Sequence, residues 1–467
     1  MVERNAGVRG AGGRGASPII YREMAAWCGI AVAALGLAGV FALLLAVSRV
    51  PGTENVFPWP IGFFGKGLVI HVVFSFVVWF LAAFATLAAA TLAEVSRPTP
   101  SVMLAAPLAA AIGLPLLFIP ALRDLGEATL NNYIPVIIDP LYYLGLLLTA
   151  AAVCGVALRL ILGRPLAAWR TDPLGVACAA AGIAYLAALA AFGISWSELA
   201  GTPPDYAFNE HLMWGGGHLL QFVNTILVIV AWGMLARLAT GEQGRWAIAI
   251  AGVSVGLATL SALALLLYGV YPAFSSPRME AFTWLQYALG PAAAIVVASL
   301  AVGLPRPIPW HHPGLRCLGM SILIFTVGGV LGLFVDGADT RTPAHYHGMI
   351  AGVSLALMGV FLLVVLPMLG RRPASTRRTA WTLGLFGWGQ LTASLGLFLA
   401  GGHGTPRKIA GEAQGLVDLP AHIGMALNGI GALIAIVGGI LFVWTIAAAL
   451  LQAPDNEKDT VHPRPAV

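Results

Sequence analysis

Residues 343–369 read PAHYHGMIAGVSLALMGVFLLVVLPML. From Met349 onward the stretch has no charged residue, and about 20 consecutive apolar residues suffice to cross the hydrocarbon core of a bilayer as a helix. Its beginning nevertheless carries two histidines, His345 and His347. The stretch therefore predicts a transmembrane helix with two imidazoles close to one membrane surface.

The same apolar pattern recurs along the whole chain. The 467 residues are 59% hydrophobic and only 10% charged, which is typical of a polytopic membrane protein. Short alternating segments, which transmembrane β-strands would require, are not evident. We expect an all-α bundle of twelve membrane helices over residues 25–450, with residues 1–24 and 451–467 as tails. The helices are predicted near 25–47, 67–92, 102–122, 136–158, 174–195, 208–236, 247–270, 280–303, 316–335, 343–369, 380–400 and 420–449.

The loops predict the orientation of these helices. If the N-terminus lies inside, 18 of the 25 Lys and Arg residues fall on the inner side. The positive-inside rule then predicts that both termini are cytoplasmic, in a bacterial-type inner membrane. The net charge of +5 forms no basic patch interleaved with aromatics, so nucleic acid is not an expected partner. The four cysteines form no metal or covalent-haem motif.

With that topology, several histidines fall in the outer part of the membrane: His71, His211, His218, His345, His347 and His422. Ionisable side chains inside a membrane are costly and usually mark function. A single one is more often a satisfied core residue. Several at one depth on different helices are better explained by a shared cofactor.

The pair on the predicted tenth helix has a specific geometry. His345 and His347 are two residues apart, or about 200° of helical rotation, so they point to opposite sides. Each can therefore ligate a different metal on its own side of the helix. The alternative is a pair of polar residues at the membrane surface.

These features resemble the core subunit, subunit I, of the haem–copper oxidase superfamily, whose tenth helix carries AHFHY where this chain has AHYHG. The compact length is most similar to the C-type and nitric-oxide-reductase-like branches. The resemblance implies two haems. His345 would hold a high-spin, oxygen-reactive haem, while His71 and His347 would hold a low-spin haem with no open iron position.

A second motif supports the resemblance. The loop at 404–408 reads GTPRK, similar to the family's GMPRR, whose basic pair contacts haem propionates. Arg407 and Lys408 are therefore expected to bind propionates, because guanidinium and ammonium groups pair well with carboxylates. The alternative is two solvated loop charges.

The distal copper site departs from the family. His218, after three glycines on the predicted sixth helix, matches the first copper ligand. Two further adjacent histidines are expected at the end of the seventh helix, where this chain reads LLLYGVYPAFSSP. Copper at His218 is therefore doubtful, because such sites need several nitrogen ligands. Tyr268 is a candidate proton or hydrogen-bond donor to a haem ligand, although Tyr268 and Tyr271 could also be interfacial anchors.

Other polar residues are weaker candidates. Glu210 and His211 are expected at the surface, and the pair His311 and His312 falls on the inner side. His403 is expected in a loop. The remaining candidates for propionate, metal or water contacts are His422, Asp336 and Asp339. No carboxylate is expected deep in a span, so the sequence does not favour proton pumping.

The expected function is that of a respiratory cytochrome c oxidase-type oxidoreductase. A cytochrome c or copper-protein subunit would deliver electrons at the acidic outer face, alongside other oxidase subunits. Electrons would pass through the low-spin haem to the haem on His345, which would reduce O2 or NO, with His345, His218 and Tyr268 as catalytic candidates. One alternative is a copper-less, non-catalytic haem protein for electron transfer or gas sensing. A twelve-span transporter would instead show inverted repeats and broken helices.

Overall fold

The computed structural model describes residues 18–48, 61–93, 95, 100–241, 243–335, 337–371, 375–409 and 411–452. Within these ranges, twelve helical segments are long and apolar enough to cross a membrane. Each of them overlaps one of the twelve predicted spans. The predicted all-α, polytopic fold is therefore confirmed.

The first six spans are α1 (Pro18–Ser48), α2 to α3 (Ile61–Val72 and Trp79–Ala93, joined by a π-helical turn at Val73–Val78), α4 (Pro100–Leu122), α5 (Pro140–Leu162), α7 (Pro173–Glu198) and α8 (Tyr206–Thr240). Short α6 (Ala168–Thr171) precedes α7.

The last six spans are α9 with α10 (Arg245–Leu263, Leu267–Val270), α11 with α12 (Ser276–Leu285, Leu289–Gly303), α13 (Pro313–Leu331), α14 with α15 (Arg341–Val360, Leu366–Met368), α16 (Thr376–Gly402) and α17 (Leu419–Leu451).

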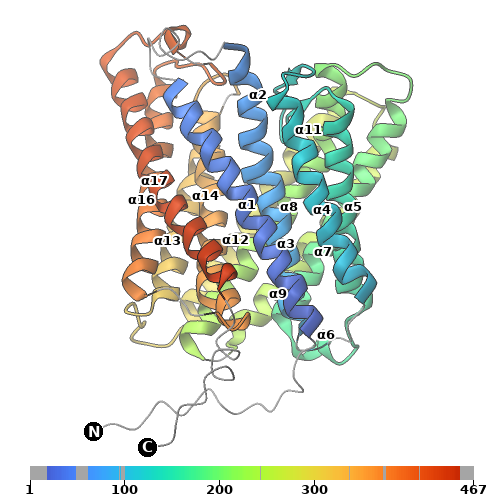
Figure 1. Ribbon diagram of the computed structural model, residues 1–467, viewed down its shortest axis with the longest axis vertical. Coiled ribbons are helices and arrows are strands. Elements are labelled where there is room, and N and C mark those ends of the chain that lie inside the picture. The colour runs from blue at the N-terminus through green and yellow to red at the C-terminus, as the bar shows by residue number, and fades with distance from the viewer. Residues whose placement is uncertain are drawn as a thin grey trace, which may run out of the picture.

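The helices form an upright bundle in which α1 begins and α17 ends at the same end (Figure 1). We call this the terminal end and the opposite one the far end. The second, sixth, tenth and twelfth spans therefore begin at the far end. That end carries the hairpin of β1 (Ala128–Thr129) and β2 (Val136–Ile137), which joins α4 to α5.

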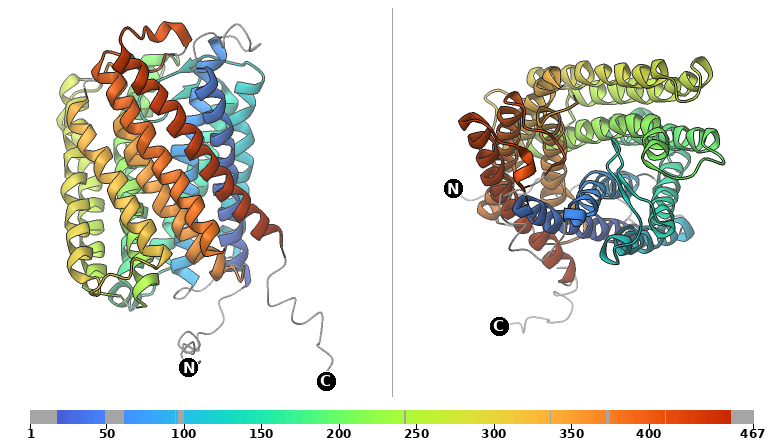
Figure 2. Two further views of the ribbon diagram at one scale, coloured as in Figure 1. Left: turned by 90° about the vertical axis from the view of Figure 1, so that its left-hand side faces the viewer. Right: turned by 90° about the horizontal axis from the view of Figure 1, so that it is seen from above.

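The histidine-bearing spans lie inside the bundle. In the most apolar 18-residue stretch of each span, 89% of the residues are buried in α8, 78% in α14–α15 and 72% in α2–α3, compared with 28% in α17. The view from above shows α16 and α17 at one edge of the bundle (Figure 2). His71, His218, His345 and His347 thus come from helices that protein surrounds, where a buried polar side chain needs a partner.

The predicted start of the fourth span was wrong. The fourth span begins at Pro140 and not at residue 136, because Val136 and Ile137 pair with Thr129 and Ala128. Asp139 then starts the helix by accepting a hydrogen bond from the Leu141 amide at 2.8 Å, with Pro140 in the first helical turn.

A carboxylate is buried near the beginning of the first span. The first span begins at Pro18, several residues earlier than predicted, and so includes Glu23, whose side chain is fully buried. Arg159 of α5 pairs with it at 2.7 Å. The pair joins two helices distant in sequence, and this partner could not be read from local hydropathy.

We expect Arg159→Leu to destabilise the protein by about 3–5 kcal/mol, because it leaves the Glu23 carboxylate buried without a counter-charge. The double variant Glu23→Leu/Arg159→Leu should recover most of this loss. Thermal unfolding in detergent measures both effects, with Arg170→Leu as the exposed control on nearby α6. A single variant as stable as that control would contradict a stabilising role for the pair.

Candidate functional site

Three of the predicted site histidines share one hydrogen-bonding arrangement. The Nδ1 atom lies 3.0 Å from the Ala38 carbonyl in His71, 2.8 Å from the Gly328 carbonyl in His345, and 2.7 Å from the Trp214 carbonyl in His218. Because a carbonyl oxygen only accepts, each Nδ1 carries the proton and each Nε2 carries the lone pair. This is the tautomer in which a histidine with a backbone partner ligates a metal through Nε2.

His345 is held against α13. A Cβ atom at Gly332 would overlap its ring, so only a glycine permits this close approach. The start of α14 is fixed to α16, because the buried Thr340 hydroxyl donates to the Leu397 carbonyl at 2.8 Å. The ring of His345 is thus fixed both by its own hydrogen bond to Gly328 and by the anchoring of its helix.

His347 lies on another face of α14, as the two-residue spacing predicts. Seven residues, or about two helical turns, separate it from Ser354, so the two share a face. The Ser354 hydroxyl accepts a hydrogen bond from Trp79 Nε1 of α3 at 3.3 Å. The face that carries His347 is therefore turned toward the second span, while His345 is turned toward α13.

The second span carries His71 as well as Trp79. Trp79 follows His71 by eight residues, and the intervening π-helical turn makes this about two turns of helix. The Trp79 ring also packs against Phe361 just beyond α14, with centroids 5.2 Å apart. The second and tenth spans are thus in direct contact about two turns from the positions of His71 and His347.

These histidines are not packed into the core like their neighbours. The side chains of His71, His345 and His347 remain partly accessible, whereas Ile70 and Ala344 beside them are buried. Their roles as haem ligands stay predictions, and the geometry of two helices in contact is compatible with them.

The loop at 404–408, which carries GTPRK, lies beside the start of α14. The Thr340 amide donates to the Thr405 carbonyl at 3.0 Å, the Arg407 amide donates to the Ala338 carbonyl at 3.3 Å, and Asp339 and Pro406 form a β-bridge. The GTPRK loop and the histidine helix, two separate motifs in the sequence, therefore meet at the far end.

Lys408 and Arg407 have different surroundings. The Lys408 ammonium donates a hydrogen bond to the Leu130 carbonyl in the β1–β2 hairpin. Among the described residues, no hydrogen bond or ion pair engages the Arg407 guanidinium. Asp339 forms an ion pair with Arg341 at 2.7 Å, and Asp336 lies outside the described residues. Arg407 is thus the better propionate candidate.

His218 is fully buried, and the β1–β2 hairpin reaches it. The Tyr133 hydroxyl lies 2.8 Å from His218 Nε2. Since Nε2 carries the lone pair, Tyr133 donates the hydrogen bond. In the part of the chain that the structure describes, no group of three or more His, Cys, Asp or Glu side chains is arranged to hold a metal ion. The surroundings of His218 do not fit a copper ion.

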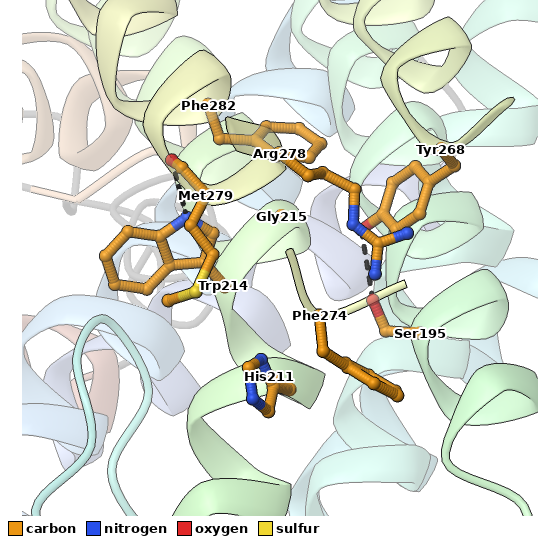
Figure 3. Close-up of a pocket in the computed structure, with 9 residues that line it drawn as sticks. All are labelled: Ser195, His211, Trp214, Gly215, Tyr268, Phe274, Arg278, Met279 and Phe282. Atoms are coloured by element: carbon orange, nitrogen blue, oxygen red, sulfur yellow. Dashed lines mark hydrogen bonds between the residues drawn. The ribbon is translucent and has the colours of Figure 1, made fainter. Parts of the chain in front are cut away.

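Tyr268 lies in a neighbouring pocket (Figure 3). Its hydroxyl is 3.0 Å from Ser195 Oγ, and its ring lies under the Arg278 guanidinium at 4.9 Å. Glu198 binds Arg278 through two hydrogen bonds of 2.8 Å. His211, expected at the surface, lines the same pocket and packs on Phe274.

The remaining histidines among the described residues lie in loops or near helix ends. His403 pairs with Asp418 at 2.7 Å, and His422 bonds the Asp418 carbonyl. His312 caps α13 at the terminal end by accepting from the Gly314 amide, and His311 precedes it. Tyr133 was missed by the sequence analysis, because nothing in its loop sequence, NNYIP, shows that it meets the sixth span.

Burial, and to a lesser degree Arg407, lowers the pKa of Lys408 to about 8, whereas Glu210 acts in the opposite direction. Between about pH 8 and the unfolded value of 10.5, the unfolded chain binds more protons, so stability should rise with pH across this window. We expect Lys408→Met to lose this rise. Thermal unfolding at several pH values in the window measures it, and identical profiles for the two proteins would contradict the assignment.

No protein-family model matches the sequence. An uncharacterized protein of Rickettsia prowazekii (strain Madrid E) is 25% identical over 487 aligned positions, covering 90% of this chain and 94% of that protein. An uncharacterized protein of Aquifex aeolicus (strain VF5) is 28% identical, covering 72% of this chain and 82% of that protein.

Among solved structures, a cryo-EM structure of a heme-copper terminal oxidase dimer has a similar fold. The TM-score is 0.72 at 15% sequence identity, covering 94% of this chain and 85% of that chain. The expected resemblance is therefore confirmed at the level of the fold.

Proposed function

We propose that this chain is an oxidase-like membrane haem protein. His71 and His347 hold a low-spin haem between the second and tenth spans, and His345 holds a second haem on the opposite side of α14. When bound, the second haem would supply an iron able to take a small diatomic molecule such as O2 or NO. The proposal rests on the fold likeness together with the arrangement of these three histidines.

The observation that carries the proposal is the fixed tautomer of His71 and His345. Each ring donates Nδ1–H to a carbonyl on a neighbouring helix, Ala38 of α1 or Gly328 of α13. These bonds orient the rings and present the Nε2 lone pair, which is the atom that binds haem iron.

Arg407 would bind a haem propionate. The loop that carries it is hydrogen-bonded to the start of α14, close to His345 and His347. A guanidinium can bind a carboxylate through two parallel hydrogen bonds. Lys408, which holds the hairpin, would contribute less.

The direction of electron flow follows from the proposed topology. With both termini cytoplasmic, the far end with its histidines faces the outer side. A cytochrome c or a copper-protein subunit would bind there, and other oxidase subunits would pack on the bundle. Electrons would then reach His347 and His71 before His345. The proposal also includes membership of the C-type or nitric-oxide-reductase-like branch. The molecule reduced would be O2 or NO.

A copper-less haem protein for electron transfer or gas sensing is the second candidate. It is supported by the hydrogen bond from Tyr133 to His218 Nε2, since a copper ion would have to displace this bond. We expect elemental analysis of the purified protein to give about two iron atoms per chain with little copper. Stoichiometric copper would contradict this second candidate and favour a complete oxidase centre.

Reduced-minus-oxidised spectra with and without carbon monoxide test the proposal. The wild type should show one low-spin haem and one haem that binds carbon monoxide. His345→Ala should lose the carbon monoxide difference signal but keep the low-spin band, because the two sites use different histidines. His71→Ala should have the converse effect.

His211→Ala is the matched control, because it removes an imidazole at the far end that lies in the Tyr268 pocket. It should leave both bands at wild-type intensity. A wild-type protein without any haem signal would overturn the proposal, and so would histidine variants that keep both bands.

A further inference from the structure

The β1–β2 hairpin places backbone and polar side chains in the interior of the far end, which is unusual for a connecting loop. Asn131 and Thr129 are 3% and 5% exposed. Buried polar groups need partners; the Asn131 side chain bonds within the hairpin, and Asn209 of α8 donates to the Thr129 hydroxyl at 3.2 Å. Glu210 accepts from the Asn132 amide at 2.8 Å and from its side chain at 2.6 Å. Lys408 also binds the hairpin, by donating to the Leu130 carbonyl.

Tyr133 lies at the tip of this hairpin in a left-handed conformation, with φ of +65°. A bulky residue keeps this conformation only when its surroundings determine it. A Cβ at Gly217 would overlap Tyr133, so the glycine admits the ring against α8. Asn132, which donates to Glu210, precedes Tyr133, and the buried Ile134 follows it. Together these contacts hold the Tyr133 hydroxyl in hydrogen-bonding distance of His218 Nε2.

We propose that Tyr133 is a positioning residue for a haem ligand pocket, acting through His218. By donating to Nε2, it keeps the His218 ring oriented and its lone pair engaged. A molecule bound to the iron would then meet an imidazole–phenol pair in place of a metal ion. This inference rests on the proposed function and adds that His218 of α8 faces the haem held by His345 of α14; these two helices pack together.

The test uses the C–O stretching band of the reduced, carbon monoxide-bound protein, because this band responds to the polarity of the pocket beside the iron. Tyr133→Phe keeps the ring against Gly217 but removes the hydroxyl, and we expect it to shift the band. Glu210→Gln weakens the hold on Asn132 and should shift it in the same direction by less. If Tyr133→Phe does not fold, Glu210→Gln provides the test in its place.

Tyr185→Phe is the matched control. The buried Tyr185 hydroxyl donates to the Ala150 carbonyl at 2.9 Å, so this variant removes a phenol hydrogen bond between α7 and α5 without touching His218 or the hairpin. It should leave the band unchanged. In a His218→Leu background, Tyr133→Phe should add no further shift, because both changes remove the same hydrogen bond.

The outcomes separate the two proposals. A carbon monoxide band that Tyr133→Phe does not move, or that Tyr185→Phe moves equally, overturns the role of Tyr133 while the haem assignment stands. Additive shifts in the His218→Leu background also overturn it. A protein with no carbon monoxide band overturns the haem assignment itself, and the role of Tyr133 with it.

Discussion

An imidazole inside a bilayer is favourable only if its polar atoms are satisfied, and here a backbone carbonyl does this for three histidines. Helical carbonyls are normally engaged along their own helix, so a side chain that bonds one from a neighbouring helix requires close packing. Ala38 and Gly328 provide this for His71 and His345. The tautomer, the ring orientation and the proposed chemistry all depend on these bonds.

The arrangement of the helices follows from the same constraint. α14 lies between α13 and the second span, so its two histidines are turned toward different neighbours. The contact between Trp79 and Ser354 joins the second and tenth spans within the core. This contact would set the spacing available to the proposed haem between these two spans.

At the far end, the fold admits irregular backbone among the helices. This is tolerated at membrane depth only where protein satisfies its polar groups. Glu210, Asn209 and Lys408 do so for the β1–β2 hairpin. The cost of the left-handed Tyr133 is offset there, and the hairpin brings a phenol to a histidine that would otherwise present a lone pair.

The sequence by itself determined the twelve spans, because a bilayer requires long apolar helices whose backbone is satisfied internally. It also identified the opposed histidines of the tenth span, since helical rotation depends only on spacing. Only the tertiary structure decided the partners: Arg159 for Glu23, Tyr133 for His218 and Leu130 for Lys408. Each joins segments distant in sequence, and such contacts depend on helix packing, which local hydropathy does not encode.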